Sequence, residues 1–158
     1  ASRVVKPGEP ARLVCERCGR IFWQDPKLAA GTLFTYEGKL VLLRRGIEPA
    51  YGKWVFPGGF VDRGEVVADG AVRETWEEAR VRVAVTDLLG LYSYPERPVV
   101  VVVYAARIVE GVPTAADETL EVGLFGPDEI PWDDLAFPST RDAVRDYVAR
   151  VLSRPSTP

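Results

Sequence analysis

A pattern of glutamates in residues 59–81 constrains this 158-residue chain more than any other feature. Residues 66–80 contain no proline and show helical periodicity, so they are predicted to form a helix. Glu74, Glu77 and Glu78 then stand at i, i+3 and i+4 and share one face of that helix. Small and apolar side chains fall on roughly the opposite face, so one face must pack while the other presents three carboxylates.

The three carboxylates need compensation, because like charges at this spacing destabilise an isolated helix by roughly 0.2–0.5 kcal/mol per pair. A divalent cation would supply it, and carboxylate oxygens favour Mg²⁺ or Mn²⁺ over zinc. The chain contains no histidine, which excludes Ser-His-Asp and Cys-His catalysis and every histidine-ligated metal site. Taken alone, three glutamates on a helix are also compatible with a solvated acidic face.

Strand patterns lie on both sides of this helix in the sequence. Residues 99–109 are apolar on both faces, as expected of a strand that is covered on both sides. A last helix is predicted to begin near Ser139 or Thr140, residue types that are favoured at the N-cap. Because strands outnumber helices and the helices flank them, the sequence predicts an α/β layered domain. The other predicted strands are residues 31–36, 39–43, 54–56, 81–91 and 118–125.

Composition argues against two classes of partner. The formal net charge is −3, whereas a protein that binds the nucleic-acid backbone normally carries a basic patch or stripe. The longest apolar run, residues 99–106, is far shorter than the roughly 20 residues of a membrane-spanning helix. Residues 1–8 have no apolar core like that of a signal peptide, so a cytoplasmic protein is expected.

The chain is predicted to divide into a leader, residues 1–28, and a main domain, residues 29–158. Residues 1–12 are rich in proline, glycine and charge and are expected to be loosely ordered. The leader is too short and polar to form a core, yet it contains the aromatic pair Phe22 and Trp23. We expect its apolar side chains to bury against the main domain or a second subunit, which predicts a homodimer.

The glutamate segment resembles the Nudix box, Gly-x5-Glu-x7-Arg-Glu-U-x-Glu-Glu-x-Gly-U, where U is a bulky aliphatic residue. Two positions depart from it: Thr75 replaces an aliphatic residue, and Arg80 replaces the late glycine. Neither departure removes a carboxylate, but Arg80 must adopt the backbone angle that the glycine supplies. The matching residues are Gly59, Glu65, Arg73, Glu74, Glu77, Glu78 and Val81.

Shorter motifs extend the resemblance to about residues 13–150, and they resemble one branch of the family. Among them are Cys15-x-x-Cys18, Gln24-Asp25-Pro26-Lys27 and Glu129-Ile130-Pro131-Trp132. Enzymes of this branch carry an N-terminal zinc ribbon and act on ADP-ribose, FAD and related nucleotides. The resemblance implies an α/β/α sandwich with a mixed β-sheet, usually a homodimer.

The activity that the resemblance implies is hydrolysis of a nucleoside diphosphate linked to a moiety X, giving a nucleoside monophosphate and X-phosphate with Mg²⁺ or Mn²⁺. ADP-ribose is the expected substrate, with FAD the next. One alternative is a housecleaning hydrolase of nucleoside triphosphates. Another is a non-catalytic ligand-sensing domain, against which the intact set of glutamates argues.

The resemblance also implies roles for individual residues. Glu74 and Glu78 match the main metal ligands, and the carbonyl of Gly58 matches a backbone ligand. Glu77 matches a further ligand or a water-orienting carboxylate, so Glu74 and Glu77 are expected to be catalytic. Glu121 matches a downstream acidic residue that binds metal or acts as the base, with a solvated strand carboxylate as the alternative.

The remaining assignments concern the motif and the substrate. Glu65 and Arg73 match an ion pair that holds the loop after Gly59 on the helix. Arg45 is expected to contact phosphate through its guanidinium, the alternative being a surface arginine of a hairpin. Phe22 and Trp23 are candidates to line the substrate cleft or a subunit interface.

Zinc is not expected to bind, because a zinc ribbon needs four ligands and this chain offers two, Cys15 and Cys18. Free thiols are predicted; a disulfide, or a zinc ion shared by two subunits, are the alternatives. Protein purified without chelator should contain well under one zinc per chain by metal analysis. Cys15→Ser/Cys18→Ser should keep full Mg²⁺-dependent activity, and stoichiometric zinc lost together with activity would overturn this prediction.

Overall fold

The structure is a computed structural model that describes residues 1–153. The chain forms eleven strands and two α-helices within that range. In order they are β1 (Ser2–Arg3), β2 (Arg12–Val14), β3 (Ile21–Phe22), β4 (Lys27–Leu33), β5 (Thr35–Tyr36), β6 (Lys39–Arg45), β7 (Trp54–Val55), β8 (Gly58–Phe60), α1 (Val67–Ala79), β9 (Arg82–Tyr92), β10 (Val99–Glu110), β11 (Thr119–Phe125) and α2 (Pro138–Tyr147). A short 3-10 helix (Trp132–Asp134) precedes α2, and a π-helical turn (Val148–Leu152) follows it.

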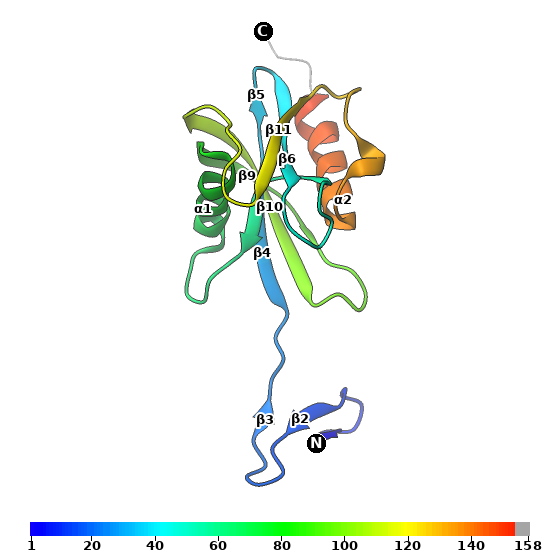
Figure 1. Cartoon of the computed structure of the whole chain (residues 1–158). Helices are drawn as coiled ribbons and strands as arrows, with labels where there is room; N and C mark the ends of the chain where they lie inside the picture. Colours follow the sequence, from blue (N-terminus) through cyan, green and yellow to red (C-terminus); the bar gives the residue numbers. More distant parts are fainter. Residues whose placement is uncertain (154–158) are drawn as a thin grey trace.

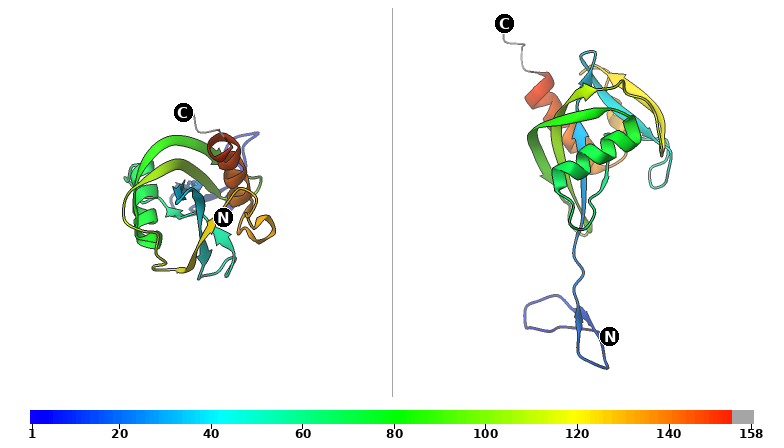
Figure 2. Two further views of the ribbon diagram at one scale, coloured as in Figure 1. Left: turned by 90° about the horizontal axis from the view of Figure 1, so that it is seen from above. Right: turned by 90° about the vertical axis from the view of Figure 1, so that its left-hand side faces the viewer.

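Two sheets form the body of the molecule. One has the order β8-β4-β10-β9, in which β4 and β10 run parallel and the other pairs antiparallel; the second has the order β11-β6-β5, with β7 added to β6. Helices α1 and α2 lie on opposite sides of the strands (Figures 1 and 2). The predicted fold class, an α/β sandwich with a mixed sheet, is therefore confirmed.

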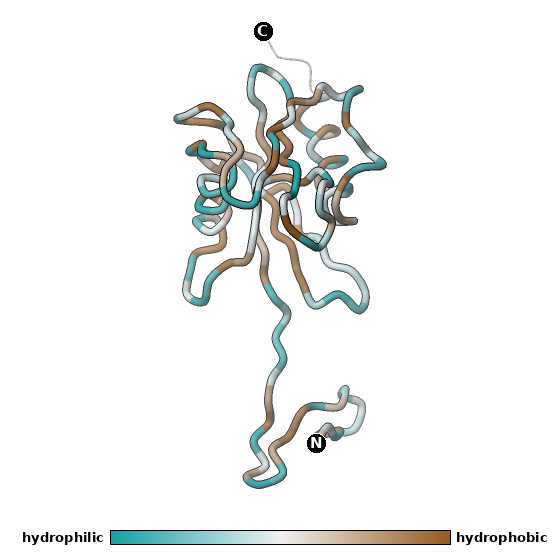
Figure 3. Tube along the Cα trace, in the orientation of Figure 1, coloured by the Kyte–Doolittle hydropathy of each residue, from teal (hydrophilic) through white to brown (hydrophobic). Residues whose placement is uncertain are grey.

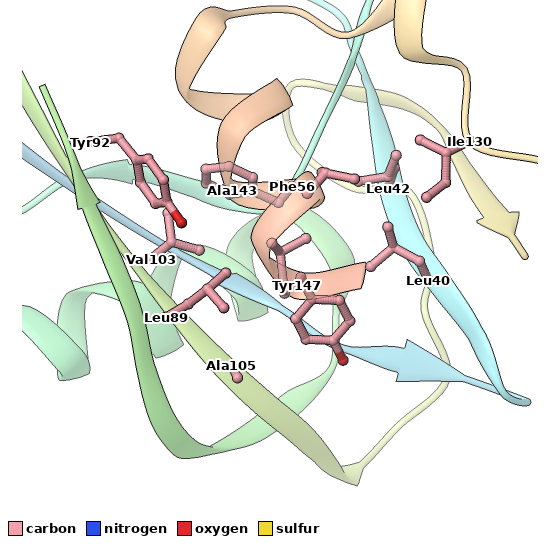
Figure 4. Packing of buried hydrophobic residues seen from close by; sticks show 12 residues of the cluster. Leu40, Leu42, Phe56, Leu89, Tyr92, Val103, Ala105, Ile130, Ala143 and Tyr147 are labelled. Carbon is pink, nitrogen blue, oxygen red and sulfur yellow. The ribbon is translucent and has the colours of Figure 1, made fainter. Parts of the chain in front are cut away.

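The sheets and α2 enclose the larger part of the core. Leu40 and Leu42 of β6, Val103 of β10 and Tyr147 of α2 all have less than a tenth of their surface exposed. Figure 4 shows these side chains converging from the strands onto the helix. The predicted N-cap of α2 was wrong: the helix begins at Pro138, whose fixed backbone angle suits a first turn and whose missing N–H needs no partner.

Helix α1 lies within the predicted residues 66–80, and the structure explains both departures from the motif. The Thr75 hydroxyl is buried, donates to the Ala71 carbonyl at 2.7 Å, and shares a 2.6 Å hydrogen bond with the Thr32 hydroxyl of β4. Arg80 caps the helix in the left-handed conformation, with φ 54°. Its guanidinium forms an ion pair with Asp117 at 3.1 Å.

Residues 1–26, which we call the arm, stand away from the body (Figure 1). Ser2–Arg3 pairs with β2, which pairs with β3, whereas residues 4–11 form no helix or strand. Apolar stretches of β2 and β3 thus lie on a small sheet that no other described part of the chain covers (Figure 3). Cys15 and Cys18 sit on its hairpin as free thiols.

Two further expectations concern the boundary of the main domain and membrane-spanning segments. Strand β4 begins at Lys27, two residues before the predicted start of the main domain, and residues 154–158 of that domain lie outside the described range. Within residues 1–153, no helix has the length and apolar character needed to cross a membrane.

Gly31 of β4 gives a test of the packing beneath the site. A Cβ at this position would lie 2.5 Å from the Phe56 ring and 2.6 Å from the Pro57 carbonyl oxygen, which is backbone and cannot move aside. Gly31→Ala should therefore lower the free energy of unfolding by about 1–3 kcal/mol, measured by urea denaturation. Gly126→Ala is the control, since its Cβ would meet only the end of the Glu129 side chain. Equal stability of the two variants would contradict this packing.

Candidate active site

Two consecutive glycines of β8 lie against the carboxylates of α1. The backbone N–H of Gly58 donates a 2.9 Å hydrogen bond to Oε2 of Glu78. A Cβ on Gly59 would fall 2.5 Å from the carboxylate carbon of Glu74, so no larger residue fits there without displacing that carboxylate. The motif glycine is thus explained by close approach of strand and helix.

Arg73 holds the loop after β8 on the helix, as the motif predicts. Its Nε and Nη2 donate to the two carboxylate oxygens of Glu65 at 2.8 and 3.0 Å, a bidentate pair. Nη2 also donates to the Phe60 carbonyl at 3.1 Å. The hydrogen bonds from Arg73, joined by one from the Asp62 N–H, lower the pKa of Glu65 to about 2.

The same guanidinium contacts two more carboxylates. Nη1 of Arg73 lies 2.8 Å from Oε1 of Glu74 and 3.2 Å from Oε2 of Glu77. Burial raises the pKa of Glu74 above its ordinary value, although the contact with Arg73 acts in the opposite direction. Arg73 therefore neutralises part of the acidic face in the absence of a cation.

Glu78 has the most perturbed carboxylate of the helix. Burial raises its pKa to about 7; the hydrogen bond from Gly58 and the charge of Arg45 oppose the shift, and the charges of Glu74 and Glu118 add to it. A small pocket of about 10 Å³ opens beside this carboxylate. Its lining residues are Leu43, Arg44, Arg45, Ile47, Val55, Glu78, Glu118 and Thr119.

The acidic face suits a hard divalent cation by its chemistry. Mg²⁺ takes oxygen ligands, keeps several waters and binds through one or two carboxylates together with phosphates, so it does not need a closed protein cage. Across residues 1–153, no group of three or more Cys, Asp or Glu side chains is already arranged to hold a metal ion. Glu74 and Glu78 flank the glycines, and their burial and raised pKa show that their negative charge lacks full compensation.

Arg45 and Glu121 lie near this pocket with their charged groups already engaged. Nε of Arg45 donates to the Pro49 carbonyl at 2.8 Å, and its guanidinium lies over the Phe137 ring at 5.0 Å. Glu121 pairs with Nη1 of Arg44 at 3.3 Å. Arg45 lines the pocket and Glu121 does not.

Glu118 was missed by the sequence analysis. It lies three residues before Glu121, immediately before β11, and lines the pocket together with Glu78, on which its charge acts. The pairing of β11 with β6 is irregular between Thr119 and Glu121, so alternation along the strand does not reveal which acidic side chain points to the site. No signal in one sequence distinguishes these two carboxylates.

Phe22 and Trp23 are not brought to the carboxylates of their own chain. Both lie at the end of the arm sheet with exposed side chains, 52% for Phe22 and 62% for Trp23. Trp23 contacts the guanidinium of Arg12, which lies 4.7 Å from its ring centroid. Within one chain the expected aromatic lining is therefore separate from the acidic face.

A protein-family model described as the NUDIX domain matches residues 25–147, which is most of the chain. The chain belongs to the Nudix family. The match includes β8, α1 and β11, so the carboxylates described above lie inside the Nudix domain. The arm up to Gln24 lies outside it.

Relatives with assigned names cover much of the same region. An ADP-ribose pyrophosphatase of Methanocaldococcus jannaschii is 32% identical over 78% of this chain and 73% of its own length. A MutT-like protein of Streptomyces ambofaciens is 34% identical over 64% of each chain. A Nudix hydrolase structure from Nitrosomonas europaea is 36% identical with TM-score 0.88, covering 98% of this chain and 89% of that one.

Ionisation of Glu78 should destabilise the metal-free protein, because its pKa in the fold, about 7, exceeds its ordinary value of 4.5. The stabilisation by its protonated form is complete below pH 4.5 and is lost as pH rises through 7. With a chelator present, Glu78→Gln should raise Tm above pH 7 and leave it nearly unchanged below pH 4.5. Mg²⁺ should raise the wild-type Tm above pH 7.

Glu121→Gln is the control for this prediction, because Glu121 is exposed and paired with Arg44. It should not raise Tm in either pH range. A Tm difference between Glu78→Gln and wild type that is the same above pH 7 and below pH 4.5 would contradict the role of Glu78 ionisation.

Proposed function

We propose that this chain is a metal-dependent pyrophosphohydrolase that cleaves a nucleoside diphosphate linked to a second moiety, with ADP-ribose the main substrate and FAD a secondary one. The observation that carries the proposal is the close approach of the two glycines of β8 to α1. Gly58 lies against the carboxylate of Glu78 and Gly59 against that of Glu74, so backbone and carboxylate oxygens come close together at one place. The likeness to a protein named ADP-ribose pyrophosphatase supports the substrate.

Glu74 and Glu78 are the proposed ligands of Mg²⁺ or Mn²⁺, with the Gly58 carbonyl and Glu77 completing the set. Such a cation, held by these residues, would supply positive charge against pyrophosphate and would lower the pKa of a bound water. Glu74 is partly buried beside Gly59, so its position is set by the backbone rather than by solvent. Glu77 is more exposed than Glu74 and contacts Arg73, and its proposed role is to orient water at the edge of the site.

Arg73 and Glu65 have a positioning role in this proposal. Their bidentate pair fixes the segment between β8 and α1, and so fixes the glycines relative to the glutamates. Arg45 is the proposed phosphate contact: its Nε is engaged by the Pro49 carbonyl, so the two terminal nitrogens of its guanidinium are the groups that would reach phosphate.

For the downstream carboxylate, the geometry favours Glu118 over the predicted Glu121. Glu118 shares the pocket with Glu78, where it can accept a proton from an attacking water or add a metal ligand. Glu121 instead forms an ion pair with Arg44, so its proposed role is to support that arginine. Glu118→Gln should therefore reduce kcat more than Glu121→Gln.

The proposal is tested by a substrate panel of ADP-ribose, FAD, a sugar nucleotide and nucleoside triphosphates with Mg²⁺ or Mn²⁺. Products are scored by phosphate release after phosphatase treatment. ADP-ribose should give the highest kcat/KM, and the products should be AMP and ribose 5-phosphate. A preference for triphosphates would favour the housecleaning alternative, and binding without turnover would favour a sensing domain.

Glu74→Gln and Glu78→Gln should each lower turnover by about 10²-fold or more, because each removes a preorganised charge from the site. Far-ultraviolet circular dichroism and melting curves should show that both variants remain folded. Turnover near the wild-type value in both variants would refute the assigned metal site, whatever the substrate preference.

A further inference from the structure

Two adjacent arginines at the end of β6 differ in how their charge is held. Arg44 donates from Nη1 to Glu121 at 3.3 Å and from Nε to the Gly52 carbonyl at 3.0 Å, so an acidic side chain pairs its charge. Arg45 lines the pocket beside Glu78, yet it forms no ion pair with any side chain in residues 1–153. The positive charge of Arg45 is therefore left unpaired beside the carboxylate site.

Two neutral groups hold the guanidinium of Arg45 instead. Its Nε donates to the Pro49 carbonyl at 2.8 Å, and its central carbon lies 5.0 Å from the centroid of the Phe137 ring. An aromatic face attracts a guanidinium without neutralising it as a carboxylate would. Neither contact takes up the N–H groups of Nη1 or Nη2, so these donors stay available while the side chain is held.

Phe137 is itself tied to the segment that follows Arg45. The connection between β6 and β7 lies beside the start of α2 (Figure 1). The Lys53 carbonyl accepts a 2.8 Å hydrogen bond from the Arg45 N–H. The carbonyl of the next residue, Trp54, accepts one of 2.8 Å from the N–H of Ala136, which precedes Phe137. Two adjacent residues thus fix the backbones on both sides of the contact between ring and guanidinium.

We propose that Phe137 is a positioning residue, whose ring holds the Arg45 guanidinium so that Nη1 and Nη2 meet a phosphate of the substrate. This inference rests on the proposed function, in which Arg45 is the phosphate contact. A long arginine side chain loses rotamer freedom when a ligand orders it, and a guanidinium that is already held loses less. A carboxylate in place of the ring would also hold the guanidinium, but it would compete with phosphate for the same N–H groups.

The first test is binding of inorganic pyrophosphate with Mg²⁺, measured by isothermal titration calorimetry, which does not depend on the identity of the nucleotide. Phe137→Leu keeps an apolar side chain but removes the aromatic face, so Kd should rise by about two- to fivefold, as expected for the loss of one exposed cation–π contact. The KM for ADP-ribose should rise by a similar factor. Phe137→Tyr keeps the ring and should bind like the wild type.

Trp76→Leu is the matched control for Phe137→Leu. It also removes a ring that lies 5.0 Å from a guanidinium, that of Arg82, but neither residue lines the pocket beside Glu78. Its Kd for pyrophosphate should equal that of the wild type.

The second test is a double-mutant cycle between Phe137 and Arg45. Arg45→Ala should raise Kd for pyrophosphate by about tenfold or more, because it removes charged hydrogen bonds to the ligand. In the Arg45→Ala background, Phe137→Leu should cause no further loss, since the ring then has no guanidinium to hold. A role of Phe137 in the fold alone would instead give the same loss in both backgrounds.

The outcomes separate this inference from the proposed function. Unchanged binding by Phe137→Leu, an equal loss by Phe137→Tyr, or an equal loss in the Arg45→Ala background would overturn the role of Phe137 and leave the function standing. Unchanged binding by Arg45→Ala would overturn the phosphate contact and this inference with it. The expected binding pattern in a wild type that hydrolyses no substrate of the panel would overturn the function and support the role of Phe137.

Discussion

One guanidinium links the loop after β8 to the acidic face of α1. Arg73 is bonded at once to the loop carboxylate Glu65 and to two carboxylates of its own helix, Glu74 and Glu77. Among the described ion pairs, those of Arg73 are the ones that join the loop after β8 to α1. Because arginine keeps its charge at any pH the protein meets, this link does not titrate with the groups it positions. Its partner Glu65, whose pKa is lowered, likewise stays ionised down to low pH.

The site gains its chemistry at the expense of stability. Glu78 is held in a partly buried place by a backbone N–H of Gly58, and its ionised form is the less stable one there. A core residue of similar volume at this position would pack without that conflict. The fold tolerates the strain because a large core lies elsewhere, between the sheets and α2. Such a conflict between burial and charge is typical of groups that act on a cation or a water rather than on the fold.

How much could be predicted from the sequence depended on whether a feature is local. The spacing of Glu74, Glu77 and Glu78 fixed the helix and its acidic face to within a residue at each end, since periodicity is a local property. The start of α2 was missed because proline at its first position outweighs the hydroxyl caps that follow. Glu118 was missed for a different reason: an irregular strand pairing decides which acidic side chain faces the pocket, and pairing is not encoded nearby.

The departure at Arg80 shows which parts of the motif carry chemistry and which carry geometry. A non-glycine residue in the left-handed conformation costs about 1–2 kcal/mol. Exposed ion pairs such as Arg80–Asp117 return about 0–1 kcal/mol, and the guanidinium also lies over the Trp76 ring at 5.7 Å. The helix therefore ends in the same backbone conformation that glycine would give, at a small net cost. No charged group of the site depends on this position, so the glycine of the motif serves the backbone turn alone. A side chain at Gly59, in contrast, would displace the carboxylate of Glu74 and so disturb the site itself.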